Sequence, residues 1–232
     1  MLFSHKAADD TDRVRVLISG LTREDDVVTA VEAGADAVGF VCYPGNFRYV
    51  TPSRLMSLTS LVPDSVTTVL LFINPTAEEV REHLVLFPHA VLQFYGNESR
   101  AFCDQFHVPY IKVVKADNFE DVLMAQDEFP MARGIVAMLT ETAWNPVGQD
   151  FDWESVHNMR SRVRKPLVIA GGLKEQSVAY AIKMLTPWAV EVASGVETAR
   201  GIKDHGKIAG FMDAVHRGGE VDPNEIDGDE DC

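Results

Sequence analysis

Short apolar runs alternate along most of the chain with segments of mixed polarity. None of the runs shows a regular polar–apolar alternation, which is typical of strands that are buried on both faces of a parallel sheet. We predict eight such strands, at residues 14–19, 37–41, 67–73, 90–94, 110–114, 134–138, 167–170 and 189–193.

The segments between the strands have the spacing of amphipathic helices. In the clearest of them, Val178, Ala181, Ile182 and Leu185 recur three or four positions apart. Two helix starts carry the spacing of a capping box, Thr22 with Asp25 and Thr76 with Glu79. The predicted helices cover 22–34, 52–61, 75 onward, 99–106, 119–125, 174–185 and a last helix opened by residues 203–205.

Eight strands separated by helical segments in one chain predict a (β/α)₈ TIM barrel, which commonly holds about 200 to 250 residues in a single domain. We expect the barrel to span residues 13–217, between a flexible leader (1–12) and a disordered acidic tail (218–232). The alternative is an open, doubly wound sheet. It is less favoured because no GxGxxG run follows the first strand.

Charge and hydropathy narrow the choice of partners. The 232 residues carry a formal net charge of −14, and the last thirteen hold seven acidic residues without a Lys or Arg. This balance argues against nucleic acid as a partner. No apolar run approaches the roughly 20 residues that a membrane span requires, so we expect no membrane association and a cytoplasmic protein. A monomer and a homodimer both stay open.

The cysteines and histidines indicate neither a disulfide framework nor a metal site. The three cysteines, Cys42, Cys103 and Cys232, are odd in number and lack ligand spacing, and the seven histidines are scattered. We therefore expect no metal and no redox cofactor.

Glycine pairs follow the last two predicted strands. Gly171 and Gly172 end one strand, and Ser194 and Gly195 end the next. Without side chains, such positions let a phosphate approach the backbone amides closely. TIM barrels commonly bind phosphate in these two loops, so we predict that these four residues hold a phosphate-bearing small molecule. The cation of Lys203 is a candidate to reinforce the site.

Several longer stretches resemble the phosphoribosylanthranilate isomerase family of tryptophan biosynthesis. They are SGLTREDDVVTAVEAGADAVGFV from Ser19, YPGNFRYVTP from Tyr43, FDW at 151–153, AGGL at 170–173, and VASGVE with GIKDH. They occur in the family's order over most of the predicted barrel. The resemblance implies an Amadori rearrangement of a phosphoribosyl-type ligand, with phosphate in the last two loops. It also implies that Arg48 meets a substrate carboxylate, which a guanidinium can bind through two hydrogen bonds.

The residues that move protons in the family are replaced in this chain. Family members carry the catalytic base as a cysteine in a Lys-Ile-Cys-Gly run, which here reads Leu17-Ile18-Ser19-Gly20. Counting back from FDW without gaps, the aspartate that serves as acid falls on Met138. A serine hydroxyl does not ionise near neutral pH, and methionine has no proton to give.

Further departures lie at the same predicted barrel mouth. Tyr95 stands where a histidine is usual, Glu191 replaces an aspartate, and the loop 139–152 contains Trp144–Gln149 in place of a glycine-rich run. Ser19, Tyr95, Glu191, Lys115, Glu141 and Cys42 all lie at or beyond predicted strand ends, where they could transfer protons. We take Ser19 and Glu191 as the catalytic candidates, because a carboxylate inside a barrel strand needs a partner or a task. Arg48 and Tyr95 are the substrate-binding candidates.

Three functions are compatible with this pattern. The first is a diverged enzyme that acts on a related phosphate-bearing ligand by another reaction, favoured by the kept phosphate loops beside the lost acid and base. The second is a non-catalytic binding or regulatory protein. The third is a slow but genuine phosphoribosylanthranilate isomerase that uses substituted groups.

Overall fold

A computed structural model describes residues 13–116, 119–138 and 160–219 of the chain. The predicted leader, nearly all of the acidic tail and the loop with Glu141 and Trp144–Gln149 lie outside these residues. Among the described residues, no helix is long and apolar enough to cross a membrane.

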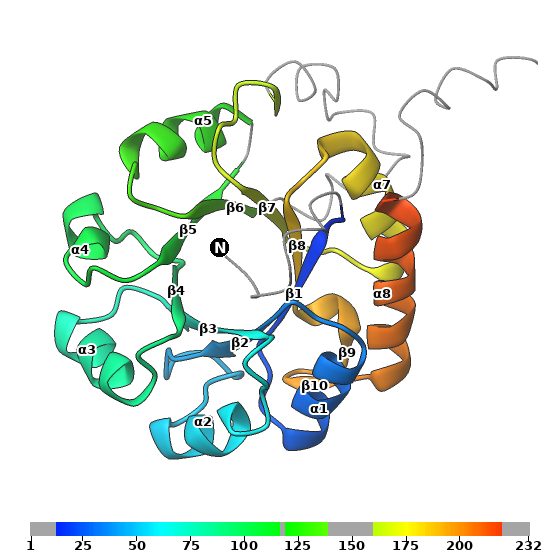
Figure 1. The fold of residues 1–232 in the computed structure, drawn as a ribbon, viewed down its shortest axis with the longest axis horizontal. Coiled ribbons are helices and arrows are strands. Elements are labelled where there is room, and N and C mark those ends of the chain that lie inside the picture. The colour runs from blue at the N-terminus through cyan, green and yellow to red at the C-terminus, as the bar shows by residue number, and fades with distance from the viewer. Residues whose placement is uncertain (1–12, 117–118, 139–159, 220–232) are drawn as a thin grey trace, which may run out of the picture.

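Eight parallel strands close into a barrel, as Figure 1 shows down its axis. Each strand pairs with the next along the chain, and β8 pairs with β1, so the open-sheet alternative is wrong. The strands are Arg15–Ser19 (β1), Ala37–Val41 (β2), Thr67–Phe72 (β3), Val91–Phe94 (β4), Tyr110–Lys115 (β5), Gly134–Met138 (β6), Leu167–Ala170 (β7) and Ala189–Val192 (β8).

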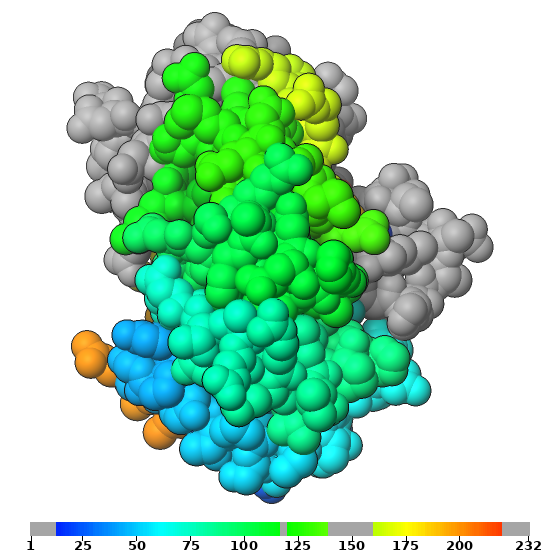
Figure 2. Space-filling model, turned by 90° about the vertical axis from the view of Figure 1, so that its left-hand side faces the viewer, coloured from blue at the N-terminus to red at the C-terminus, as the bar shows by residue number. Residues whose placement is uncertain are grey.

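The helices surround this barrel on its outer side (Figure 1). Figure 2 shows one flank, where the cyan-to-green segments between β3 and β6 cover the strands. The helices are Glu24–Glu32 (α1), Pro52–Thr59 (α2), Ala77–Leu86 (α3), Arg100–Asp104 (α4), Phe119–Glu128 (α5), Glu175–Leu185 (α7) and His205–Gly219 (α8), with a 3₁₀ turn at Ser194–Val196 (η2). The predicted barrel boundary at residue 217 falls inside the last turn of α8.

Local capping followed the sequence pattern at one helix and not at another. Thr76 and Glu79 form the predicted capping box at the start of α3. Thr22 does not cap α1, which begins after Arg23 without a side-chain cap. The Thr22 hydroxyl instead donates to the carbonyl of Gly201, 2.6 Å away. The Thr22 hydroxyl therefore forms a tertiary hydrogen bond with the segment after β8 and does not cap the helix.

A short hairpin after β8 was not predicted from the sequence. Glu197–Ala199 (β9) pairs antiparallel with Ile202–Lys203 (β10) just before α8. Its strands have three and two residues, too short to show a hydrophobic period.

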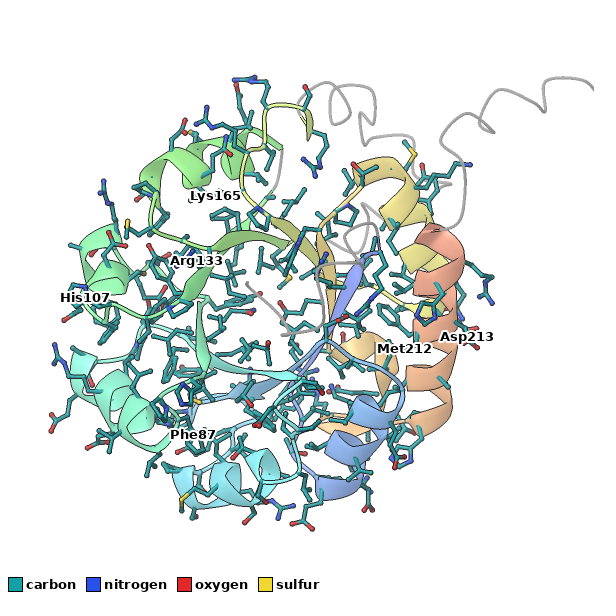
Figure 3. The ribbon with its side chains drawn as sticks, in the orientation of Figure 1. Phe87, His107, Arg133, Lys165, Met212 and Asp213 are labelled. Atoms are coloured by element: carbon teal, nitrogen blue, oxygen red, sulfur yellow. The ribbon has the colours of Figure 1, made fainter. Side chains whose placement is uncertain are left out.

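The apolar residues pack in two layers. Alternate side chains of the strands fill the barrel interior, among them Leu17, Val69, Ile111 and Val168. The larger layer lies between the strands and the helices. Figure 3 shows the division on α8, where Met212 turns towards the neighbouring elements and Asp213 turns away from them. Because these side chains fill the barrel interior, we expect a ligand to bind at the carboxyl ends of the strands.

A buried ion pair holds the connection after β4. Lys112 Nζ lies 2.8 Å from Glu98 Oε2 and donates to the carbonyl of Gly96 at 2.6 Å. Glu98 in turn accepts the backbone N–H groups of Asn74 and Gly96. Both charged side chains are almost fully buried, so removing either one leaves an uncompensated charge in the interior.

Replacing Lys112 with alanine is therefore expected to lower the free energy of unfolding by about 3–5 kcal/mol. Urea denaturation measures the loss. Lys115→Ala is the matched control, because Lys115 lies on the same strand and is exposed; it should cost less than about 0.5 kcal/mol. Equal losses in the two variants would contradict the assignment.

Candidate active site

One cavity of about 310 Å³ opens at the carboxyl ends of the strands. Its described lining comes from β1, β2, β3, β6, β7, β8 and the loops that follow them, and from Tyr95 directly after β4. The lining residues used below are Ser19, Asn46, Arg48, Tyr95, Met138, Gly171, Gly172, Leu173, Glu191, Ala193, Ser194 and Gly195.

The cavity brings together the catalytic, substrate-binding and phosphate-binding residues predicted from the sequence. Ser19, Glu191, Arg48, Tyr95 and the four residues of the glycine pairs all line it, and so does Met138. Two weaker candidates do not: Lys115 is exposed and Cys42 is buried outside the lining. A third, Glu141, lies outside the described residues.

The glycine pairs adopt backbone conformations that other residues tolerate poorly. Gly171 and Gly172 have φ angles of 94° and 63°, in the left-handed region that favours glycine. At Gly195 an added Cβ would lie 1.8 Å from the carbonyl oxygen of Leu173. The two loops therefore contact each other at Gly195. Outside helices and strands, the amide N–H of Gly172 donates to no other described residue. Gly195 lies in the first turn of η2, where backbone N–H groups lack an intrahelical partner. Both amides therefore suit an anion.

Arg48 is held at the rim by a carboxylate of the chain itself. Its Nε and Nη2 atoms donate to the two oxygens of Glu197 at 2.7 and 2.8 Å. Lys203 Nζ reaches the same carboxylate at 3.0 Å and also donates to the carbonyl of Ala193 at 2.9 Å. Lys203 thus braces the loop after β8 and is not among the residues that line the cavity, so reinforcement of a phosphate site by its charge stays a prediction.

Burial and ion pairing shift the pKa values of Glu197 and Lys203 in opposite directions. Burial alone would raise the pKa of Glu197, but the hydrogen bond from Arg48 and the charge of Lys203 outweigh it and lower that pKa. Burial lowers the pKa of Lys203 to about 8, although Glu197 favours its charged form. At neutral pH the cluster keeps Arg48 in a fixed direction with one guanidinium nitrogen, Nη1, outside the pairing with Glu197.

Glu191 is the acidic group of the described cavity lining. It is 6 % exposed and points inward from β8. Burial raises its pKa, an effect that hydrogen bonds from Ser19 and Gln93 and the charge of Lys203 only partly oppose. A carboxyl group with a raised pKa exists in both protonation states closer to neutral pH, as a general acid or base requires.

Ser19 and Tyr95 lie beside this carboxyl group. Ser19 ends β1 opposite Gly39 of β2, where an added Cβ would lie 2.9 Å from the Cβ of Ser19. The missing side chain of Gly39 therefore leaves room for Ser19. Burial, with the charge of Glu191, raises the pKa of Tyr95, so its phenol stays protonated and acts as a hydrogen-bond donor.

Sequence reasoning missed three polar groups at the site. Gln93 lies on β4 in a run read as apolar, Glu197 stands in the VASGVE motif, and Asn46 lines the cavity beside Arg48. A glutamine inside a buried strand was a usable signal, because buried amides need partners. The pairing of Glu197 with Arg48 spans 149 positions and has no local signature. Across the described ranges, no cluster of His, Cys, Asp and Glu could hold a metal ion.

The sequence is similar to one family of known proteins. The family model of N-(5'-phosphoribosyl)anthranilate (PRA) isomerase matches residues 16–214. An N-(5'-phosphoribosyl)anthranilate isomerase of Dechloromonas aromatica is 42% identical over 209 residues, which cover 90% of this chain and 99% of the relative. One of Pseudomonas fluorescens is 42% identical over 203 residues, covering 87% and 98%.

Solved structures agree with this comparison. A phosphoribosyl anthranilate isomerase in complex with reduced 1-(o-carboxyphenylamino)-1-deoxyribulose 5-phosphate superposes with a TM-score of 0.77 at 33% identity. The enzyme from Thermotoga maritima gives the same TM-score and identity, and each alignment covers 88% of this chain and 98% of the other.

Burial makes Cys42 a poor candidate for proton transfer. Burial raises the pKa of its thiol to about 12, and the pKa of Cys103 is raised to a similar value, also mainly by burial. Such a thiol is ionised to about one part in 10⁴ at pH 8. In a Cys232→Ser variant, we expect both thiols to resist a disulfide reagent at pH 8 until urea unfolds the chain. Fast modification of Cys42 in the folded protein would show that the thiol is accessible after all.

Proposed function

Because the chain belongs to the phosphoribosylanthranilate isomerase family, we propose that it binds an N-phosphoribosyl aromatic amine bearing a carboxylate and isomerises it slowly. The single observation that carries this proposal is the shared cavity, into which the glycine loops, Arg48 and Glu191 all open. The glycine loops offer amides for a phosphate, Arg48 offers a guanidinium for a carboxylate, and Glu191 offers a proton-transferring group beside Ser19 of β1 and Gln93 of β4.

The shape of the ligand in a relative supports the binding mode. The molecule bound in that isomerase structure carries a phosphate and a carboxyphenyl group. In this chain, the amides of Gly172 and Gly195 suit the phosphate. Arg48 suits the carboxylate, because its Nη1 stays outside the ion pair with Glu197. Glu197 and Lys203 then act as supports that fix the direction of the guanidinium.

The chemistry needs one proton delivered and one removed. In an Amadori rearrangement the ring oxygen takes a proton as its bond to C1 breaks, which leaves an imine at C1. A base then removes the proton from C2, and the resulting enolamine becomes the ketone as C1 gains a proton and the C2 hydroxyl loses one. Neutral Glu191 can deliver the first proton, and the carboxylate so formed can accept the proton of C2. No metal or redox cofactor enters this sequence of steps.

Ser19 and Tyr95 have supporting parts in this proposal. Ser19 stabilises the ionised form of Glu191 through its hydrogen bond, and Tyr95 can donate to an oxygen of the ligand. Met138 offers no proton. A single carboxyl group that serves as acid and base in turn replaces two dedicated groups, each worth roughly 10² to 10⁴ in rate. The expected turnover is therefore slow.

A second candidate function is a different reaction on a related ligand. It is favoured by Ser19 and Met138, which stand where the resemblance places the base and the acid of the family. A binding protein without catalysis would share the same cavity. Product analysis after incubation with phosphoribosylanthranilate separates these candidates: formation of the ribulose phosphate supports the isomerase, and its absence in a protein that binds the reduced product analogue supports the others.

Glu191→Gln is expected to lower kcat for phosphoribosylanthranilate by about 10²- to 10⁴-fold, because the amide cannot exchange the proton. Steady-state fluorescence assays measure kcat, and calorimetry with the reduced product analogue measures binding, which should change little. Glu82→Gln, an exposed position on α3, is the matched control. Unchanged kcat in Glu191→Gln would remove Glu191 from the mechanism.

Gly195→Ala is expected to weaken binding of the same analogue by at least about tenfold. The new Cβ must displace the carbonyl of Leu173 and so shift both phosphate loops. Gly219→Ala is the control, since an added Cβ there meets nothing within 4 Å. Calorimetry reports the dissociation constants, and thermal melting verifies that the variant is folded. A folded Gly195→Ala protein with wild-type affinity would refute the proposed phosphate site.

A further inference from the structure

Gln93 bridges the barrel interior beneath the cavity. It lies on β4, is completely buried, and does not belong to the cavity lining. Its Nε2 donates to Glu191 Oε2 at 2.8 Å, which joins β4 to β8 on the far side of the barrel. Its Oε1 finds no hydrogen-bond partner among the described residues. An unpaired buried oxygen is unfavourable, so this side chain requires an explanation.

The groups around Glu191 come from three parts of the fold. Ser19 faces it from β1, Gln93 faces it from β4 with Tyr95 directly after that strand, and Lys203 acts on it from β10. Lys203 is already committed to Glu197 and to the carbonyl of Ala193. Gln93 is the amide of this set, and it carries a donor and an acceptor on one planar group.

A carboxyl group that changes its protonation state needs different partners before and after. The ionised form needs donors, and the neutral form needs an acceptor for its O–H. Half a turn of the terminal amide of Gln93 exchanges Nε2 for Oε1 at the same place. Oε1, the oxygen without a partner, is therefore the acceptor that neutral Glu191 requires. In either state, one of the two polar atoms of the amide bonds to Glu191 and the other has no partner among the described residues.

We propose that Gln93 is a positioning residue that holds Glu191 in both protonation states by rotating its terminal amide. In one state Nε2–H donates to the carboxylate, and in the other Oε1 accepts the O–H of the neutral carboxyl group. The catalytic meaning of this arrangement rests on the proposed function, in which Glu191 transfers protons. The hydrogen-bond arrangement itself can be tested without substrate.

The test is a titration of Glu191 in the free, full-length protein. Glutamate labelled with ¹³C at Cδ gives a carboxyl signal that is assigned to Glu191 by its loss in Glu191→Gln. Gln93→Met keeps a long unbranched side chain but has no amide. The carboxylate loses a donor and the neutral form loses an acceptor. Because a hydrogen bond to the charged form is the stronger of the two, we expect the pKa of Glu191 to move upward in this variant. An unchanged titration would overturn the proposal.

Gln126→Met is the matched control. Gln126 is also a buried amide, but it binds the backbone of Arg162 and Arg164 on the outer side of the barrel. Its replacement should leave the titration of Glu191 unchanged, and a shift of equal size would overturn the proposal as a general effect of core damage. If Gln93→Met does not fold, Gln93→Asn withdraws the amide by one methylene and should move the pKa in the same direction.

Kinetics provide the second readout. Since Gln93 does not line the cavity, Gln93→Met should lower kcat by about 10²-fold and leave KM near the wild-type value. A rise in KM without a fall in kcat would count against a positioning role. A wild-type protein without isomerase activity would refute the proposed function alone, because the titration is independent of turnover. An active enzyme whose Glu191 titrates identically in Gln93→Met would refute this inference alone.

Discussion

Hydrogen bonding between β1 and β8 closes the sheet, and the candidate site exists only because of that closure. The register sets Leu17 opposite Glu191 and Ile18 opposite Val192, so Ser19 at the end of β1 reaches the carboxyl group of a strand more than 170 positions later. The same closure stacks the carboxyl ends of all eight strands around one axis. Loops from both ends of the chain thereby share one cavity.

Closure also determines the electrostatics of the cavity. Side chains that point inward from β8 lose contact with water, which penalises the charged form of Glu191 and raises its pKa. The cost is reduced by polar groups from β1 and β4, which the barrel places around the same atom. At the rim the balance differs, because Arg48 and Lys203 together keep Glu197 ionised. One structure thus holds one carboxyl group whose pKa is raised, Glu191, and another whose pKa is lowered, Glu197.

The sequence predicted the architecture well because each strand and helix has a local signal. Buried strands such as 37–41 matched the structure residue for residue, and the glycine pairs after β7 and β8 marked one wall of the cavity. Prediction failed where distant segments compete for a group. Thr22 had the spacing of a cap but binds Gly201, and the pairing of Lys203 with Glu197 was not predicted. Neither partner can be inferred from spacing, since both contacts depend on how the hairpin after β8 folds back.

The proposed function combines the phosphate loops and the altered acid and base in one claim. We propose that this barrel binds a phosphorylated aromatic amine so that Glu191 faces its reacting carbons. A crystal structure of the protein with reduced 1-(o-carboxyphenylamino)-1-deoxyribulose 5-phosphate tests the statement most directly. The account predicts the phosphate at the amides of Gly172 and Gly195, the carboxylate at Arg48, and C2 next to the carboxyl group of Glu191. A ligand bound in the opposite direction, or with C2 out of reach of Glu191, would contradict it.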